Sequence, residues 1–233
     1  ARTLSIVQIS DLHVERLTRR EHDLLRTLER LQPDLILFTG DYLSLSYIGE
    51  ARAVSELHTF LRRLPARYGV YAVRGTPEVD PRSIMPMLFD GLPVTVLENR
   101  HVDLELEGHR LRLVGVGCDR DLQADRTAFE AALAGARDER YTILLYHMPD
   151  LMPAAAAAGI DLYLAGHTHG GQLRVPFFGA LATCSHSRKR YEMGWYREGR
   201  TRLYVSRGVG LEGMGAPRAR FLCPPEVVHV RLE

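Results

Sequence analysis

The sequence has few cysteines and no long apolar run, and these shortages exclude several classes of protein. Its three cysteines, Cys118, Cys184 and Cys223, are far apart and lack Cys-x-x-Cys spacing. They therefore support neither a disulfide framework nor a zinc knuckle. No apolar run approaches the roughly 20 residues that a membrane-spanning helix needs. No segment resembles a nucleic-acid-binding module.

The chain also lacks the features that separate domains. Apart from the alanine run 154–158, it contains no low-complexity segment, no repeat and no linker rich in Pro, Gly or Ser. We therefore predict one domain over residues 1–233. The sequence begins without methionine and enters a strand directly, so membrane association through an N-terminal leader or anchor outside these residues is an open expectation. The compartment stays unassigned.

The formal charge of +1 is unevenly distributed. Residues 171–233 contain 11 Lys and Arg against 5 Asp and Glu, whereas residues 1–170 contain 19 against 24. A basic C-terminal quarter beside an acidic body favours an anionic substrate. Arg174, Arg188 and Arg190 are therefore candidate substrate-binding residues, and solvated surface charge is the competing interpretation.

Apolar strands alternate with amphipathic helices along most of the chain. We expect strands at 4–9, 34–39, 69–74, 94–97, 101–107, 111–116, 142–146, 161–165, 202–206 and 227–232. Thr18 and Glu21 form a capping box that starts the first helix, and Asp125 is expected to cap a later one. This alternation predicts an α/β fold whose functional site lies at the carboxyl ends of strands.

Metal-type side chains follow several of the predicted strands. These are Asp11, His13, Asp41, His147, His167 and His169. Carboxylates and imidazoles suit divalent transition metals. Each residue also has a plainer interpretation, because an Asp after a strand is most often a turn former or helix cap. Six such coincidences are difficult to attribute to turn chemistry.

The order of these residues resembles the calcineurin-like metallophosphoesterases. The matching blocks are Ser-Asp-Leu-His at 10–13, Gly-Asp at 40–41, His-Met-Pro-Asp at 147–150 and Gly-His-Thr-His-Gly-Gly-Gln at 166–172. They are similar to one bacterial branch of single-domain phosphodiesterases, some members of which cleave the pyrophosphate bond of UDP-diacylglucosamine. The resemblance implies two stacked mixed β-sheets flanked by helices in a four-layer sandwich.

The resemblance also implies a dinuclear centre of the Mn, Fe or Zn kind. One metal would be held by Asp11, His13, Asp41 and His169, and the second by Asp41 as the bridge, His147, His167 and the residue at position 76. Two such cations, about 3.5–4 Å apart, bridge a hydroxide that attacks phosphorus. The implied substrate is an anionic phosphoester, such as a nucleotide-diphospho-lipid or a nucleotide sugar.

One block departs from the family pattern. The family has Gly-Asn-His-Asp/Glu where this chain has Gly75-Thr76-Pro77-Glu78. Thr76 offers a hydroxyl in place of an amide carbonyl, so the second metal is expected to bind more weakly. Pro77 replaces the histidine that assists the transfer, and loss of a general acid typically costs about 10²–10⁴-fold in rate. Without the resemblance, Thr76-Pro77-Glu78 is typical of a helix start.

Two hypotheses follow. In the first, the protein is a metal-dependent phosphodiesterase or pyrophosphohydrolase that uses Asp41, His147 and Glu78 and prefers good leaving groups. In the second, it is a catalytically impaired metal-binding or scaffold protein on the same fold. His186 and Glu78 are the candidate substitute acids, although their spacing gives neither any support.

Overall fold

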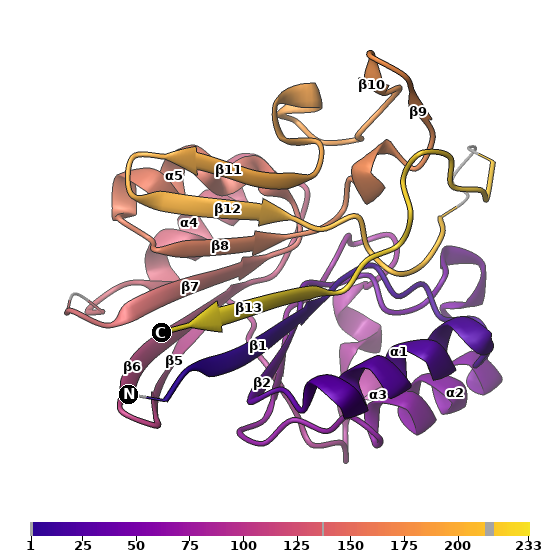
Figure 1. The fold of residues 1–233 in the computed structure, drawn as a ribbon, viewed down its shortest axis with the longest axis horizontal. Coiled ribbons are helices and arrows are strands. Elements are labelled where there is room, and N and C mark those ends of the chain that lie inside the picture. Colours follow the sequence, from indigo (N-terminus) through magenta and orange to yellow (C-terminus); the bar gives the residue numbers. More distant parts are fainter. Residues whose placement is uncertain (1, 137, 213–216) are drawn as a thin grey trace.

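Two mixed β-sheets lie face to face in the structure (Figure 1). The structure, a computed structural model, describes residues 2–136, 138–212 and 217–233. The first sheet contains, in spatial order, β13 (Val228–Leu232), β1 (Leu4–Ile9), β2 (Leu35–Phe38), β3 (Val70–Ala72) and β4 (Val94–Val96). The second contains β11 (Gly194–Glu198), β12 (Thr201–Val205), β8 (Leu162–Ala165), β7 (Tyr141–Tyr146), β6 (His109–Val116) and β5 (Arg100–Leu106).

Most neighbouring strands in both sheets run parallel. The antiparallel pairs lie at the sheet edges, where β13 pairs with β1, β11 with β12 and β5 with β6. Because parallel strands send their carboxyl ends to the same side, the residues that follow β1, β2, β3, β7 and β8 gather at one edge of the sandwich. The pairing of β13 with β1 also brings the last strand beside the first. The single-domain organisation over 1–233 stays a prediction.

Helices cover the outer face of each sheet. The first sheet is covered by α1 (Arg19–Leu31), α2 (Ala51–Leu61) and α3 (Met85–Phe89), and the second by α4 (Leu122–Ala132) and α5 (Met152–Ala158) (Figure 1). The predicted four-layer α/β sandwich is therefore confirmed. None of the helices in the described ranges combines the length and the apolar character that crossing a bilayer requires.

Several short elements complete the chain. The 3₁₀ turns are η1 (Leu45–Tyr47), η2 (Arg82–Ile84), η3 (Pro149–Leu151), η4 (His169–Gly171) and η5 (Arg188–Tyr191). A small hairpin, β9 (Arg174–Val175) and β10 (Gly179–Ala180), follows η4 directly and projects beyond the second sheet (Figure 1).

The apolar core has three layers because the central strands are buried on both faces. In β2, Leu35 and Leu37 face the other sheet, whereas Ile36 and Phe38 pack against the helices. In β7, Leu145 likewise joins the layer between the sheets. Such strands appear in a sequence as continuous apolar runs, which is why β1, β2, β7 and β8 were predictable from sequence.

Two local predictions had different outcomes. The capping box is confirmed, because the Thr18 N–H donates to Glu21 Oε2 at 2.8 Å and the Thr18 side chain accepts from the helix. The predicted cap at Asp125 is wrong. Asp121 caps α4, whereas Asp125 is buried inside the helix and accepts a hydrogen bond from the Tyr146 hydroxyl at 2.6 Å. Strand β11 was not predicted, because its pattern of exposed and half-buried residues lacks an apolar face.

Polar side chains connect the two sheets near the convergent edge. Gln8 of β1 donates from Nε2 to Thr39 Oγ1 at 3.1 Å and to the carbonyl of Ala165 at 2.9 Å. The His147 ring bonds the Thr39 carbonyl at 2.6 Å. Buried polar groups are stable only when paired, so these bonds align the ends of β1, β2, β7 and β8.

The layer between the sheets is expected to dominate stability. Leu145→Ala removes a fully buried side chain, and we expect a loss of about 2–5 kcal/mol in the free energy of unfolding because a cavity is left. Urea unfolding measures the change. Leu122→Ala, at an exposed position of α4, should cost no more than about 0.5 kcal/mol. Equal losses in the two variants would contradict this assignment of the core.

Candidate metal centre

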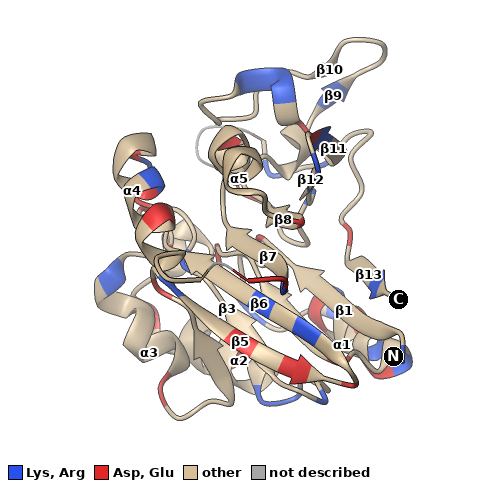
Figure 2. Ribbon diagram, turned by 90° about the vertical axis from the view of Figure 1, so that its left-hand side faces the viewer, with Lys and Arg blue, Asp and Glu red and all other residues tan. Residues whose placement is uncertain are grey.

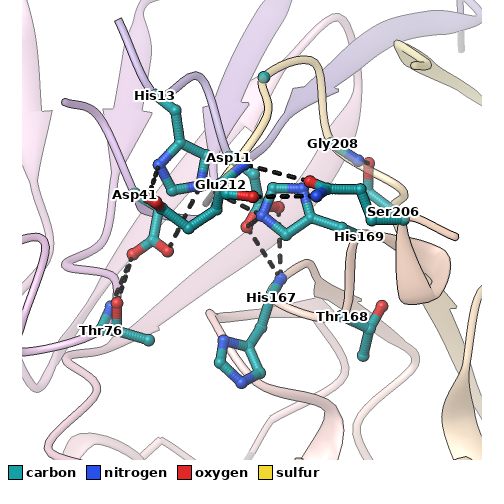
Figure 3. A network of polar contacts seen from close by, with 12 residues as sticks. Asp11, His13, Asp41, Thr76, His167, Thr168, His169, Ser206, Gly208 and Glu212 are labelled. Carbon is teal, nitrogen blue, oxygen red and sulfur yellow. Dashed lines mark hydrogen bonds and ion pairs between the residues drawn. The ribbon is translucent and has the colours of Figure 1, made fainter. Parts of the chain in front are cut away.

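Two groups of candidate ligands meet at the convergent edge. Asp11, His13 and His169 form the first group, and Asp41, His147 and His167 form the second. Within each group, one ligand atom from each residue lies within 4.8 Å of the others. The six residues follow β1, β2, β7 and β8, so both sheets contribute. Figure 3 labels all of them except His147.

Lone-pair atoms of the two groups approach one another closely. The Nε2 atoms of His13 and His169 are 3.1 Å apart, and His169 Nε2 is 3.5 Å from Asp11 Oδ1. In the second group, His147 Nε2 is 3.3 Å from Asp41 Oδ2. The same Asp41 oxygen is 3.8 Å from His13 Nε2, so the Asp41 carboxylate faces both groups.

The outer ring nitrogens explain how these imidazoles are oriented. His147 Nδ1 contacts the Thr39 carbonyl, His167 Nε2 contacts the Cys184 carbonyl at 3.0 Å, and His13 Nδ1 lies 3.1 Å from Glu212 Oε2. Because these partners only accept, each outer nitrogen carries a hydrogen, and the inner nitrogen is the one that can offer a lone pair to a cation. This is the arrangement that metal-ligating histidines adopt.

The buried acceptors at the centre fit divalent cations. His147 Nε2 is buried and, within the described chain, makes no hydrogen bond, although it faces the Asp41 carboxylate. Two acceptors that face each other need a proton or a cation between them. Imidazole nitrogens and carboxylate oxygens are suitable ligands for Mn, Fe or Zn, so the residues present fit such ions.

Electrostatics divides these groups. The pKa values of Asp41, His167 and His169 are lowered, which favours their metal-binding forms, whereas burial lowers the pKa of His13 but the nearby Glu212, Asp41 and Asp11 outweigh it and raise that pKa. Burial raises the pKa of Asp41, but the neighbouring His147, His13 and His167 outweigh it and hold this pKa well below its usual range. Burial lowers the pKa of His169 to about 3. Burial also lowers the pKa of His147, but Asp41 and Asp11 outweigh it and raise that pKa to about 9. Without a cation, a proton therefore occupies the space between His147 and Asp41.

The backbone is strained where the ligands lie. Asp11, His13, Asp41, His167 and His169 all have positive φ, between 44° and 68°. Non-glycine residues rarely adopt this conformation, and such strain concentrates at functional sites. Gly166 permits the close approach of β8 and the end of β1, because a Cβ there would lie 1.9 Å from Ser10 Oγ.

Residues 75–80, where the sequence departs from the expected family pattern, form a turn beside Asp41. The Thr76 N–H and hydroxyl both donate to Asp41 Oδ1, at 2.8 and 3.0 Å, and the N–H groups of Val79 and Asp80 close the turn on the Thr76 carbonyl. The plainer alternative, a helix start at Thr76, is therefore wrong, and the role of Thr76 as a metal ligand stays a prediction. In the described chain, the Thr76 hydroxyl orients the Asp41 carboxylate.

The remaining predicted residues lie outside the two ligand groups. Glu78 is exposed and pairs with Arg120 at 3.0 Å. Arg174 pairs with Glu192 at 3.0 Å, and Arg190 pairs with Glu198 at 2.6 Å. Arg188 and His186 are exposed. The catalytic role of Glu78 and the substrate-binding roles of the arginines therefore stay predictions.

Asp80 supports the site and was missed by sequence reasoning. Its buried carboxylate accepts from the backbone N–H groups of Asp41 at 2.7 Å, Gly75 at 2.9 Å and Tyr42 at 3.2 Å. Burial is the largest cause that raises its pKa, to about 7. No periodicity or motif in the sequence marks Asp80, because its partners are main-chain groups, and two of the three belong to another loop.

Arg220 was missed for a similar reason. Its Nη2 donates to the carbonyls of Arg207 at 2.8 Å and Gly210 at 2.6 Å, and lies 3.4 Å from His169 Nδ1. Arg220 therefore ties the loop after β12 to the first ligand group. Only the folded chain brings this arginine beside a histidine 51 residues away.

The fold and the site together define the class of the protein. A sandwich of two mixed sheets, with two groups of His and Asp at the carboxyl ends of its strands, is the architecture of a metal-dependent hydrolase. The chain belongs to the calcineurin-like phosphoesterase family, because the sequence model of that family matches residues 4–171. It is therefore a metallophosphoesterase.

Individual relatives agree with this assignment. The phosphodiesterase YaeI of Escherichia coli is 30% identical, over 100% of this chain and 83% of its own length. The UDP-2,3-diacylglucosamine pyrophosphatase LpxG of Chlamydia muridarum is 24% identical, over 98% of this chain and 83% of its own length. The structure of TT1561 from Thermus thermophilus has the same fold, with a TM-score of 0.58, 13% identity, and coverage of 89% of this chain and 91% of that one.

Asp80 is expected to stabilise the loops that carry Asp41. Asp80→Asn replaces one acceptor oxygen by an NH₂ group, so at least one buried N–H loses its partner. We expect a loss of about 1–3 kcal/mol in the free energy of unfolding. Urea unfolding of the metal-free protein measures it. Glu78→Gln, an exposed carboxylate in the same turn, should change stability by no more than about 0.5 kcal/mol, and a similar loss there would refute the role of Asp80.

Proposed function

We propose that this metallophosphoesterase is a dinuclear phosphodiesterase or pyrophosphohydrolase that favours good leaving groups. One observation carries the proposal, namely the buried set of histidine lone pairs and carboxylates that face one another around Asp41. The family match supports metal-dependent phosphoester hydrolysis, and the names of YaeI and LpxG support diester and pyrophosphate substrates.

Each candidate ligand has a specific part in this proposal. The first cation would be held by Asp11, His13, Asp41 and His169, and the second by Asp41, His147 and His167. Two bound divalent cations of the Mn, Fe or Zn kind supply Lewis acidity, which activates water and stabilises charge on the phosphoryl oxygens. The protein holds the inner nitrogens in place through the Thr39 carbonyl, the Cys184 carbonyl and Glu212.

Thr76 orients the bridge in this proposal. Its hydroxyl and N–H both bond Asp41 Oδ1, which leaves Asp41 Oδ2 facing the histidines. The second cation then has three side-chain ligands, which is enough for an open site but weaker than a set of four.

No proton donor at position 77 can protonate the leaving group. A proline side chain has no dissociable hydrogen, Glu78 is paired with Arg120, and His186 is exposed. A phosphate in a pyrophosphate link needs no such proton at neutral pH, whereas a simple alcohol does. The proposed substrate is therefore a nucleotide-diphospho-lipid or a nucleotide sugar, with Arg174, Arg188 and Arg190 as proposed anion contacts. Of these three, Arg188 is the strongest candidate, because no carboxylate pairs with its side chain in the described ranges.

Pro77 also favours a second candidate function. If the loss of the acid silences the site, the protein acts as a metal-binding or scaffold module. The two experiments below separate these functions.

Hydrolysis of bis(p-nitrophenyl) phosphate with added Mn²⁺ tests the proposed activity. His147→Ala removes a candidate ligand. Mutation of a residue that only supports a metal ligand typically lowers activity by roughly 10–100-fold, so we expect the activity of this variant to fall by more than that. His22→Ala, on the exposed face of α1, should retain full activity. Absence of turnover by the wild-type protein would favour the scaffold function.

Dependence on the leaving group tests the role of position 77. Among aryl phosphodiesters, the wild-type rate should fall steeply as the pKa of the leaving phenol rises. Thr76→Asn combined with Pro77→His should flatten this dependence and raise the rate for basic leaving groups by about 10²–10⁴-fold, because a general acid is restored. Pro77→Ala, which restores no acid, is the matched control. A flat dependence in the wild-type protein would contradict the proposal.

A further inference from the structure

Exposed apolar side chains gather on one surface beside the candidate metal centre. Of the nine large apolar residues that are strongly exposed in the described ranges, six belong to this surface: Val175, Phe177, Phe178, Leu181, Phe221 and Leu222. We call these six residues the apolar tip. Contiguous exposed apolar residues mark interaction sites, whereas isolated ones need no explanation.

The hairpin and the C-terminal loop form one surface. Leu173 pairs with Phe221 as an isolated bridge, and the Arg174 N–H donates to the Phe221 carbonyl at 3.1 Å. Lys189 of η5 holds the other side, because its Nζ donates to the Phe178 carbonyl at 2.7 Å and lies 3.6 Å from the centre of the Phe178 ring. The apolar tip is therefore attached to ordered elements on both sides.

Phe177 lies at the end of the hairpin, where both its exposure to solvent and its backbone conformation are unfavourable. Its side chain is fully exposed, with a relative accessibility of 111%, and its φ is 65°. A bulky residue at positive φ is strained, and glycine would relieve both the strain and the exposure. An aromatic residue at this position is therefore explained by a partner that covers it.

The charge around the apolar tip is positive. Residues 171–190 contain four Lys and Arg and no Asp or Glu, and residues 217–222 contain two Arg and no acidic residue. In Figure 2, the basic residues of η5 appear as a blue stretch of ribbon near β9 and β10. Three carboxylates pair with these cations, because Glu192 contacts Arg174 and Lys189, Glu198 contacts Arg190, and Glu15 contacts Arg218. Six basic residues against three acidic ones leave a net positive charge beside the tip. Aromatic residues surrounded by cations suit an anionic bilayer, which accepts the rings among its acyl chains and attracts the cations to its headgroups.

We propose that the apolar tip docks on the surface of an anionic lipid bilayer. The tip adjoins the metal centre, because η4 contains His169 and leads directly into β9, and a Cβ on Gly171 would lie 2.2 Å from Ala180 Cβ. Docking would thus hold the mouth of the site against the bilayer. Such docking favours an amphipathic phosphoester as substrate. This consequence for the substrate rests on the proposed function, but the docking of the tip does not.

Flotation with vesicles tests the docking. The wild-type protein should float with vesicles of phosphatidylcholine and phosphatidylglycerol, less with phosphatidylcholine alone, and less at raised salt. Phe177→Ser with Phe178→Ser should lower the partition coefficient by about tenfold or more, because two rings no longer enter the bilayer. Trp195→Ser removes an exposed aromatic side chain on β11 and should float as the wild-type protein does.

Two further measurements complete the test. Hydrolysis of the soluble bis(p-nitrophenyl) phosphate should be unchanged in the double variant, which shows that it folds; circular dichroism serves if the wild-type protein has no activity. Failure of the proposed function therefore leaves the flotation result intact. Docking is overturned if the wild-type protein does not float, if all variants float equally, or if a wild-type dimer dissociates in the double variant, which would make a second copy the partner.

Discussion

The attraction between buried carboxylates and imidazoles is the interaction on which the rest of the structure depends. Asp11 and Asp41 lie at the junction of the two sheets, where nearly all contact with water is lost. Burial of negative charge is costly unless positive charge is nearby. Protonated histidine or a divalent cation supplies that charge. The positive φ angles of five candidate ligands show that the backbone is held in a conformation that only the surrounding contacts maintain.

Main-chain groups provide most of the support for this cluster. Asp80 accepts from the N–H groups of Asp41 and Gly75, the carbonyls of Thr39 and Cys184 orient two imidazoles, and Arg220 binds carbonyls beside His169. Thr76 adds to this support, because its N–H and its hydroxyl both donate to Asp41 Oδ1.

The metal centre and the apolar tip share one short segment. The chain passes from His167 and His169 through η4 into β9 and reaches Phe177 within eight residues of His169. The Cys184 carbonyl, which follows β10, accepts from His167. Both ends of the hairpin therefore lie close in the chain or in space to His167, a member of the second group of candidate ligands. A contact at the tip therefore lies directly beside the candidate site.

The sequence by itself determined the α/β class, the buried strands and the six candidate ligands. Continuous apolar runs, capping residues and His or Asp after strands are local patterns, and local patterns can be recognised in the sequence alone. The roles of Thr76, Asp80 and Arg220 were decided only by the tertiary structure, because their partners are main-chain atoms or distant loops. The same holds for Asp125. A local sequence rule predicts that it caps a helix, whereas in the folded chain it is buried and accepts a hydrogen bond from the Tyr146 hydroxyl. The apolar tip also required the fold, since an apolar residue is exposed or buried only by what packs against it.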